Sequence, residues 1–229
     1  MINILKSILL RYSLVNHNRF LSSSMEFLFE KCWKCQREID RFECTTHCPC
    51  EKNVLLPVKR EIDYFRLFHL PKSFELDVNL LTKAFRTKMK LLHPDLFANK
   101  SSEDQQYSQD QSSYLNEAYS TLHSPLERAL YLLKLENIIF EETTTTLDPD
   151  FLMKIMEMNE ELADDKTIKH FPTNLAIEIR QEMDSLLKQL SNTLHKMDLP
   201  KAKELVGKLN YYTNLDDKIK SLELKHGIL

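Results

Sequence analysis

The chain has 229 residues, of which 42% are apolar and 28% charged, and its formal net charge is −3 at pH 7. Because only two residues are glycine, the chain lacks the glycine-rich loops that cradle nucleotide phosphates, and strand-rich folds with many tight hairpins are excluded as well. The slightly acidic charge disfavours nucleic acid as a partner. The apolar runs are shorter than the roughly 18 residues that cross a bilayer, so we expect no membrane partner.

Residues 1–24 differ in composition from the rest of the chain. They contain Lys6, Arg11, Arg19 and five serines, and the first carboxylate of the chain is Glu26. A basic, serine-bearing segment without acids is typical of a mitochondrial transit peptide. We therefore expect the protein in the mitochondrial matrix. A tail without a targeting role is the alternative, and a cytosolic pool stays open.

Residues 25–56 form a cysteine-rich segment that holds every cysteine of the chain: Cys32, Cys35, Cys44, Cys48 and Cys50. The two-residue spacing between Cys32 and Cys35 lets both thiolates reach one ion from a tight turn. Cys44 is the natural third ligand of such a site. The segment therefore predicts a bound metal.

Four nitrogen or sulfur ligands close the coordination sphere of a structural zinc ion. We expect Cys48 to be the fourth ligand, with His47 and Cys50 as alternatives, and zinc to be the cofactor, with iron left open. A thioredoxin-like redox pair is the competing interpretation. Such a pair normally lies in a βαβ context, which this sequence lacks.

From Asp63 onward the pattern is helical. Residues 63–68 predict a short apolar helix, and Asp77 has the position of the N-cap of a longer one that ends at His93-Pro94-Asp95. Three cations of the longer helix share one stripe: Lys83, Arg86 and Lys90. The longer helix is therefore predicted to be amphipathic with a basic face.

The stretch 99–111 is rich in Ser, Gln and acids, which predicts an exposed loop that is too polar to bury. A third helix is expected over residues 114–122. Pro125 then opens a further helix that continues through residue 133, because proline is favoured in the first turn of a helix.

The tetrathreonine 143–146 indicates a linker. Asp148-Pro149-Asp150 combines a cap, a proline at the first helical position and an early acid, so it predicts a helix start. Two more amphipathic patterns cover residues 179–194 and 205–222. Three consecutive long helices with short joints predict an antiparallel bundle.

The first bundle helix is apolar on two sides. One side is expected to face the core and carries Phe151, Ile155, Met158 and Leu162. The opposite side carries Leu152, Met153 and Met156, bordered by Glu157 and Glu160. Such a helix is either enclosed in a core or presents one face to a partner, and methionine suits an adaptable docking surface. Packing of Leu152 and Met156 under the linker is the alternative.

The His93-Pro94-Asp95 tripeptide, between a basic amphipathic helix and an antiparallel third helix, resembles the J-domain of DnaJ-type co-chaperones. Further stretches resemble the HscB-type J-proteins of iron–sulfur cluster assembly: Asp63 to Phe68, His93 to Phe97, Leu115 to Tyr119, Pro125 to Ala129 and Phe151 to Met153. The cysteine-rich segment resembles the eukaryotic members, whose second C-x-x-C pair is irregular in this chain.

The resemblance implies a co-chaperone rather than an enzyme. Members of this family dock on the ATP state of a DnaK-type chaperone and stimulate its ATP hydrolysis. Carried over to this sequence, His93, Pro94 and Asp95 form the essential loop. The docking face is supplied by the basic stripe: Lys83, Arg86 and Lys90. The chain itself is then expected to bind no nucleotide.

The resemblance also implies an iron–sulfur cluster scaffold protein as the second partner. In the family it binds the first bundle helix, so the second apolar side and its acids become the candidate contacts: Leu152, Met153, Met156, Glu157 and Glu160. Tyr211, which lies off the core stripe of the last helix, is expected to join them. A homodimer stays open.

The predicted fold class is all-α, with a J-domain helical hairpin, a C-terminal antiparallel three-helix bundle and a small N-terminal zinc segment. The predicted segments are the transit peptide 1–24, the cysteine-rich segment 25–56, the J-domain with its connecting helix 57–140 and the scaffold-binding bundle 141–229. The alternatives are a general J-protein of mitochondrial folding or import and, from another class, a zinc or thiol redox enzyme.

Overall fold

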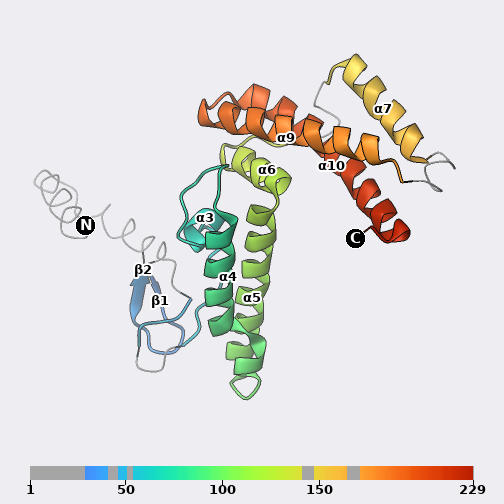
Figure 1. The fold of residues 1–229 in the computed structure, drawn as a ribbon. Coiled ribbons are helices and arrows are strands. Elements are labelled where there is room, and N and C mark those ends of the chain that lie inside the picture. The colour runs from blue at the N-terminus through green and yellow to red at the C-terminus, as the bar shows by residue number, and fades with distance from the viewer. Residues whose placement is uncertain (1–28, 41–45, 51–53, 141–146, 164–170, 229) are drawn as a thin grey trace, which may run out of the picture. The chain divides into compact units, whose positions relative to one another are not determined.

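The computed structural model describes residues 29–40, 46–50, 54–140, 147–163 and 171–228. The predicted transit peptide and Cys44 lie outside these residues. The elements are β1 (Phe29–Lys31), β2 (Glu38–Asp40), α3 (Tyr64–Leu67), α4 (Val78–Leu92), the 3-10 turn η1 (Pro94–Phe97), α5 (Ser102–His123), α6 (Pro125–Leu135), α7 (Pro149–Ala163), α9 (Thr173–His195) and α10 (Leu199–His226) (Figure 1). The predicted all-α fold class is confirmed. No helix in the described part of the chain is long and apolar enough to span a membrane.

The described chain forms two compact units. The first contains the described residues up to 69 together with 85–116, and the second contains 70–84 together with the described residues from 117 onward. The four-segment division expected from the sequence stays a prediction.

In the first unit, a two-stranded antiparallel hairpin of β1 and β2 precedes the helices, with Glu30 paired to Ile39. Glycine does not occur in its turn, and Gln36 takes the left-handed conformation with φ of 59°. The scarcity of glycine therefore excludes strand-rich folds but not this one hairpin. Ile39 joins a small core that also buries Val54 and Leu56.

Helices α4 and α5 form the predicted hairpin. Thr82, early in α4, lies 3.2 Å from the hydroxyl of Tyr119, late in α5. Conversely, Ser108, early in α5, donates to the carbonyl of Leu92 at the end of α4. The two helices are therefore antiparallel. The start of α4 is capped by Asp77, whose carboxylate accepts the Asn79 N–H at 2.8 Å as predicted.

The exposed loop expected over residues 99–111 is wrong. Helix α5 begins at Ser102, and Ser101 caps it by accepting the N–H of Asp104 at 3.2 Å. Ser108 and Gln111 are buried although they are polar, because each donates a hydrogen bond to a backbone carbonyl. Satisfied hydrogen bonds remove the cost of burial that made a loop the expected structure.

In the second unit, α7, α9 and α10 form the predicted bundle. Phe151 contacts Tyr211, and Asn159 contacts Lys218, so α7 and α10 run in the same direction. Helix α9 runs the opposite way, since residues 196–198 alone separate it from α10. The core is continuous and includes α6; its largest fully buried side chains from the bundle are Ile179, Leu190, Leu209 and Leu215.

Candidate functional site

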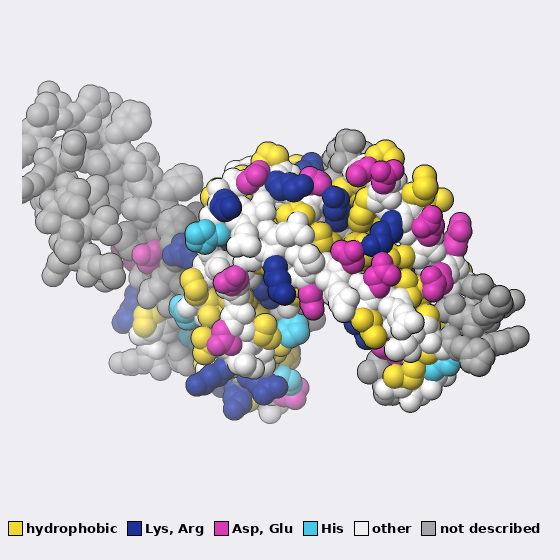
Figure 2. Space-filling view, turned by 45° about the horizontal axis from the view of Figure 1, so that its top comes forward, with side chains coloured by type: hydrophobic (Ala, Val, Ile, Leu, Met, Phe, Trp, Pro, Cys, Tyr) yellow, Lys and Arg dark blue, Asp and Glu magenta, His cyan; other side chains and the backbone are white. Residues whose placement is uncertain are grey.

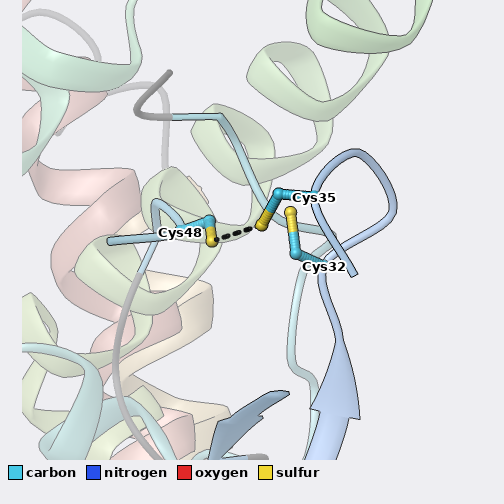
Figure 3. A group of neighbouring side chains, drawn as sticks. All are labelled: Cys32, Cys35 and Cys48. Atoms are coloured by element: carbon cyan, nitrogen blue, oxygen red, sulfur yellow. Dashed lines mark hydrogen bonds between the residues drawn. The ribbon is translucent and has the colours of Figure 1, made fainter. Parts of the chain in front are cut away.

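Three thiols converge in the cysteine-rich segment. The sulfur atoms of Cys32, Cys35 and Cys48 all lie within 4.8 Å of one another, and those of Cys35 and Cys48 are 3.6 Å apart (Figure 3). Cys32 and Cys48 are buried, whereas Cys35 is exposed. The arrangement brings together three of the four ligands expected from the sequence, and such a group can hold a metal ion.

Two backbone turns place these thiols. In the first, the Cys32 N–H donates to the Arg37 carbonyl at 2.9 Å and the Gln36 N–H donates to the Cys32 carbonyl at 3.0 Å. In the second, the Cys48 N–H donates to the Val54 carbonyl at 2.8 Å. The Arg37 guanidinium then donates to the Pro49 carbonyl at 2.9 Å and so joins the two turns.

The surroundings act oppositely on two of the thiols. Burial raises the pKa of Cys48 to about 12, and the thiols of Cys35 and Cys32 add to this effect. Burial also acts to raise the pKa of Cys32, but the backbone N–H groups of Cys35 and Lys34 outweigh it, so the pKa is lowered. Amide groups that point at a sulfur favour the thiolate, which is the form that binds metal.

The structure distinguishes among the alternative ligands. His47 is not part of the thiol group, and its Nδ1 lies 2.9 Å from the hydroxyl of Thr46. Cys50 is half-buried against the core of the segment and lies outside the 4.8 Å group. Cys48 is therefore the residue of the second cluster that meets the C-x-x-C pair. The position of Cys44 is not described.

A second candidate site is the turn after α4. His93 caps η1, and its Nδ1 accepts the N–H of Asp95 at 3.3 Å. His93, Pro94 and Asp95 are all exposed. The turn therefore offers the three residues of the motif to solvent.

The basic stripe precedes this turn along α4. Its three residues are exposed, as expected: Lys83, Arg86 and Lys90. No acidic residue lies in α4, so the positive charge of the helix is not balanced within it. A surface of this kind speeds the approach of an acidic partner.

A third candidate site is the apolar side of α7 that faces away from the core. Ile155, Met158 and Leu162 are buried as predicted, whereas Met153 and Met156 are 60% and 62% exposed. The linker lies outside the described residues, so packing of Leu152 and Met156 beneath it stays an alternative. Figure 2 shows one face of the molecule, on which hydrophobic, acidic and basic side chains are intermixed.

The remaining candidates on the bundle border this side. Leu152 is half-buried, and Glu157 and Glu160 are exposed. Tyr211 is half-buried and packs edge-on against Phe151, with ring centroids 6.1 Å apart.

Sequence reasoning missed a shallow hollow beside Tyr211. Its polar lining includes Asn159, Asn214 and Lys218, and the Lys218 ammonium donates to the side-chain oxygen of Asn159 at 2.6 Å. Hydrophobic periodicity gives no signal for such a feature, because its residues are polar and come from two helices.

Several known proteins are similar to this chain in sequence or in structure. Residues 147–220 match the family described as the HSCB C-terminal oligomerisation domain. The iron–sulfur cluster co-chaperone protein HscB of Mus musculus is 37% identical over 83% of this chain and 81% of its own length. The HscB homolog of Arabidopsis thaliana is 32% identical over 82% of this chain and 72% of its own length. The crystal structure of human co-chaperone protein HscB matches with a TM-score of 0.76 and 32% identity, covering 87% of this chain and all of that one.

Proposed function

The chain belongs to the HscB family of iron–sulfur cluster co-chaperones, and from that membership we propose that it stimulates ATP hydrolysis by a DnaK-type chaperone and delivers an iron–sulfur cluster scaffold protein to it. The observation that carries the proposal is the presence of two different exposed surfaces on one chain. One is the His93 turn with the basic stripe of α4, and the other is the apolar and acidic side of α7. We place this activity in the mitochondrial matrix, on the composition of residues 1–24.

The chaperone side works by positioning and charge. Lys83, Arg86 and Lys90 attract an acidic surface of the chaperone, which raises the rate of encounter more than it raises affinity. The exposed turn of His93, Pro94 and Asp95 then makes the contact that promotes hydrolysis. The chemistry takes place in the chaperone, so this chain acts without catalysis of its own.

Binding of the scaffold protein to α7 is driven by burial of apolar surface. Met153 and Met156 present flexible side chains that adapt to a partner surface, while Leu152 supplies a partly fixed anchor beside them. Glu157 and Glu160 at the rim select a partner that carries positive charge. Tyr211 extends the contact onto α10.

The metal has a structural role in this proposal. Cys32, Cys35 and Cys48 together with Cys44 would hold zinc in a closed site, which stabilises the segment and leaves no position open for a substrate. The competing redox function requires a reactive thiol of low pKa that is open to solvent, whereas Cys32, whose pKa is lowered, is buried.

ATP turnover by a cognate DnaK-type chaperone tests the chaperone side. We expect the wild-type chain to increase turnover and His93→Gln to abolish the increase, because the turn loses its imidazole. His195→Gln is the matched control, since His195 is also an exposed histidine but lies at the end of α9. Stimulation that survives in His93→Gln contradicts the proposal.

Capture of the scaffold protein tests the other side and separates this function from general protein folding. Replacing Leu152, Met153 and Met156 by alanine should abolish binding of the scaffold. Ile177→Ala, which removes another exposed apolar side chain of the bundle, should leave it unchanged. If the chain were a general J-protein, neither the wild-type chain nor its Ile177→Ala variant would bind the scaffold specifically.

A further inference from the structure

The last carbonyl of α4 has two unusual partners. The hydroxyls of Ser108 and Ser112 both donate to the carbonyl oxygen of Leu92, each at 2.8 Å. All three residues are buried, with exposed fractions of 0%, 6% and 1%. Because Ser108 and Ser112 are four residues apart on α5, their side chains lie on one face of that helix.

The turn after α4 explains why this carbonyl needs partners. In a continuing α-helix it would accept the N–H of Leu96, but that N–H donates to the carbonyl of His93 at 3.0 Å instead. The N–H of Asp95, which would be the partner in a 3-10 continuation, donates to the Nδ1 of His93 at 3.3 Å. The carbonyl of Leu92 is therefore one of the orphan groups at a helix end, and a buried orphan is unfavourable unless it is hydrogen-bonded.

The turn itself has little packing to hold it. None of the four residues of η1 is buried. Its far end is tied to the same helix, because the side-chain amide of Gln105 donates to the carbonyls of Ala98 and Lys100, both at 3.1 Å. Helix α5 therefore contacts the chain on both sides of the His-Pro-Asp turn, through buried hydroxyls before it and an exposed amide after it.

We propose that Ser108 and Ser112 are positioning residues for the His93 turn. By fixing the carbonyl of Leu92, one residue before His93, they fix the direction in which the chain leaves α4 and so the orientation of the exposed motif. The inference rests on the proposed function of that motif. One hydroxyl is enough to satisfy the carbonyl, whereas two hold it in a single direction.

The serines are tested with alanine variants in the ATP turnover assay. Ser108→Ala and Ser112→Ala alone should each lower maximal stimulation by no more than about twofold, because one hydroxyl remains. The double variant should lower it by about tenfold, since the carbonyl then lacks both donors. Ser113→Ala is the matched control, because Ser113 is the exposed neighbour on the same helix.

Two readouts distinguish positioning from general stability. Binding of the scaffold protein and the denaturation midpoint of the second unit should be unchanged, while hydrogen exchange at the amides of Asp95 and Leu96 should quicken several-fold in the double variant. Ser108→Ala combined with Ser112→Thr, which keeps one hydroxyl, should return both stimulation and exchange to the levels of Ser108→Ala alone. If the double variant does not fold, faster exchange in the single variants than in Ser113→Ala decides the question.

The proposal is overturned if the folded double variant stimulates and exchanges as Ser113→Ala does, or if threonine restores neither property. Its failure is separable from failure of the proposed function. When His93→Gln abolishes stimulation but the double serine variant does not, only the positioning role is lost. When His93→Gln leaves stimulation intact, the function fails, and exchange at Asp95 and Leu96 still tests whether the serines hold the turn.

Discussion

The two units of the molecule are stabilised internally by different kinds of interaction. In the first, side chains bind backbone carbonyls of distant segments: Trp33 to Leu55, Lys59 to Asp40, Gln111 to Leu56 and Tyr114 to Ile62. The second unit instead buries a continuous set of mainly aliphatic side chains from α6, α7, α9 and α10.

This difference predicts which substitutions destabilise each unit. A directional hydrogen bond weakens steeply when its geometry changes, whereas an apolar core accepts replacements that keep its volume. The first unit therefore depends on a few specific groups, the three converging thiols among them. The second buries a continuous core and still leaves Met153 and Met156 of α7 exposed.

Removal of the metal should have the largest effect, and it should be confined to the first unit. Structural zinc contributes about 10–16 kcal/mol in small zinc domains, so we expect the segment around Cys32 and Cys48 to unfold on chelation. Trp33, the single tryptophan, reports this directly, because its indole N–H donates to the Leu55 carbonyl at 2.8 Å and its ring lies 5.8 Å from that of Tyr107. Its emission should shift to the red.

Cys48→Ser supplies the control for chelation. The variant should show the red-shifted emission without a chelator, and added zinc should restore the wild-type chain but not the variant. The midpoint of helix unfolding in the second unit should stay the same throughout. Emission from Trp33 that does not change in protein shown to be metal-free would contradict the assigned role of the metal.

Arg180→Met should have the next largest effect, and it should be confined to the second unit. The guanidinium of Arg180 bonds Asp216 and Glu223, each at 2.9 Å, and both carboxylates are buried. Loss of one partner of a buried ion pair lowers the free energy of unfolding by about 3–5 kcal/mol. Because the Arg180 side chain is 45% exposed, we expect a smaller loss of about 2 kcal/mol, measured by urea unfolding. Lys201→Met, which breaks a surface pair with Glu204, should cost under about 1 kcal/mol.

The pH dependence of this variant gives a second measurement. Burial acts to raise the pKa of Asp216, but the bonds from Lys220 and Arg180 outweigh it and hold the pKa below its usual value of 3.8. The stabilisation is therefore complete above that pH and is lost as the pH falls through the lower value. Without Arg180 the pKa rises, so acid unfolding should begin at a higher pH. An unchanged acid transition would contradict the assignment.

Met197→Gly should have the smallest effect, a gain in stability of the second unit. Met197 follows α9 with φ of 58°, a conformation that costs side-chain-bearing residues about 1–2 kcal/mol. After the entropy of the more flexible unfolded chain is counted, about 0.5 kcal/mol remains, seen as a rise in Tm of about 1–2 °C. Asn137, with φ of 60°, is the matched site, and Asn137→Gly should gain less because asparagine tolerates this region. An equal gain at both sites would contradict the strain at Met197.

Local features of the fold could be predicted from the sequence because local chemistry determines them. Asp77 and Asp148 cap their helices as expected, since a carboxylate reaches an N–H two or three residues ahead. The turn at His93 could be placed for a similar reason, because Pro94 ends the preceding helix.

Features that depend on contacts between distant segments could not be predicted. The burial of Ser108 and Gln111 depends on carbonyls more than a dozen residues away, so their polar stretch was expected to be a loop. Cys48 was the expected ligand, but His47 stayed an alternative, because only pairing with Val54 and Leu55 across the second turn places the Cys48 thiol and not His47 in the group. The Ser101 to Asp104 cap and the acids of the first turn, Glu103 and Asp104, were local signals that could have revealed the start of α5.

The most direct test of the account is ATP turnover by the DnaK-type chaperone, measured with and without the scaffold protein. The central claim is that two separate surfaces of one chain serve two partners. His93→Gln should therefore lose all stimulation while it still binds the scaffold. The alanine variant of Leu152, Met153 and Met156 should keep stimulation in the absence of scaffold but should no longer bind the scaffold. Loss of both properties in either variant, or of neither, would contradict the account.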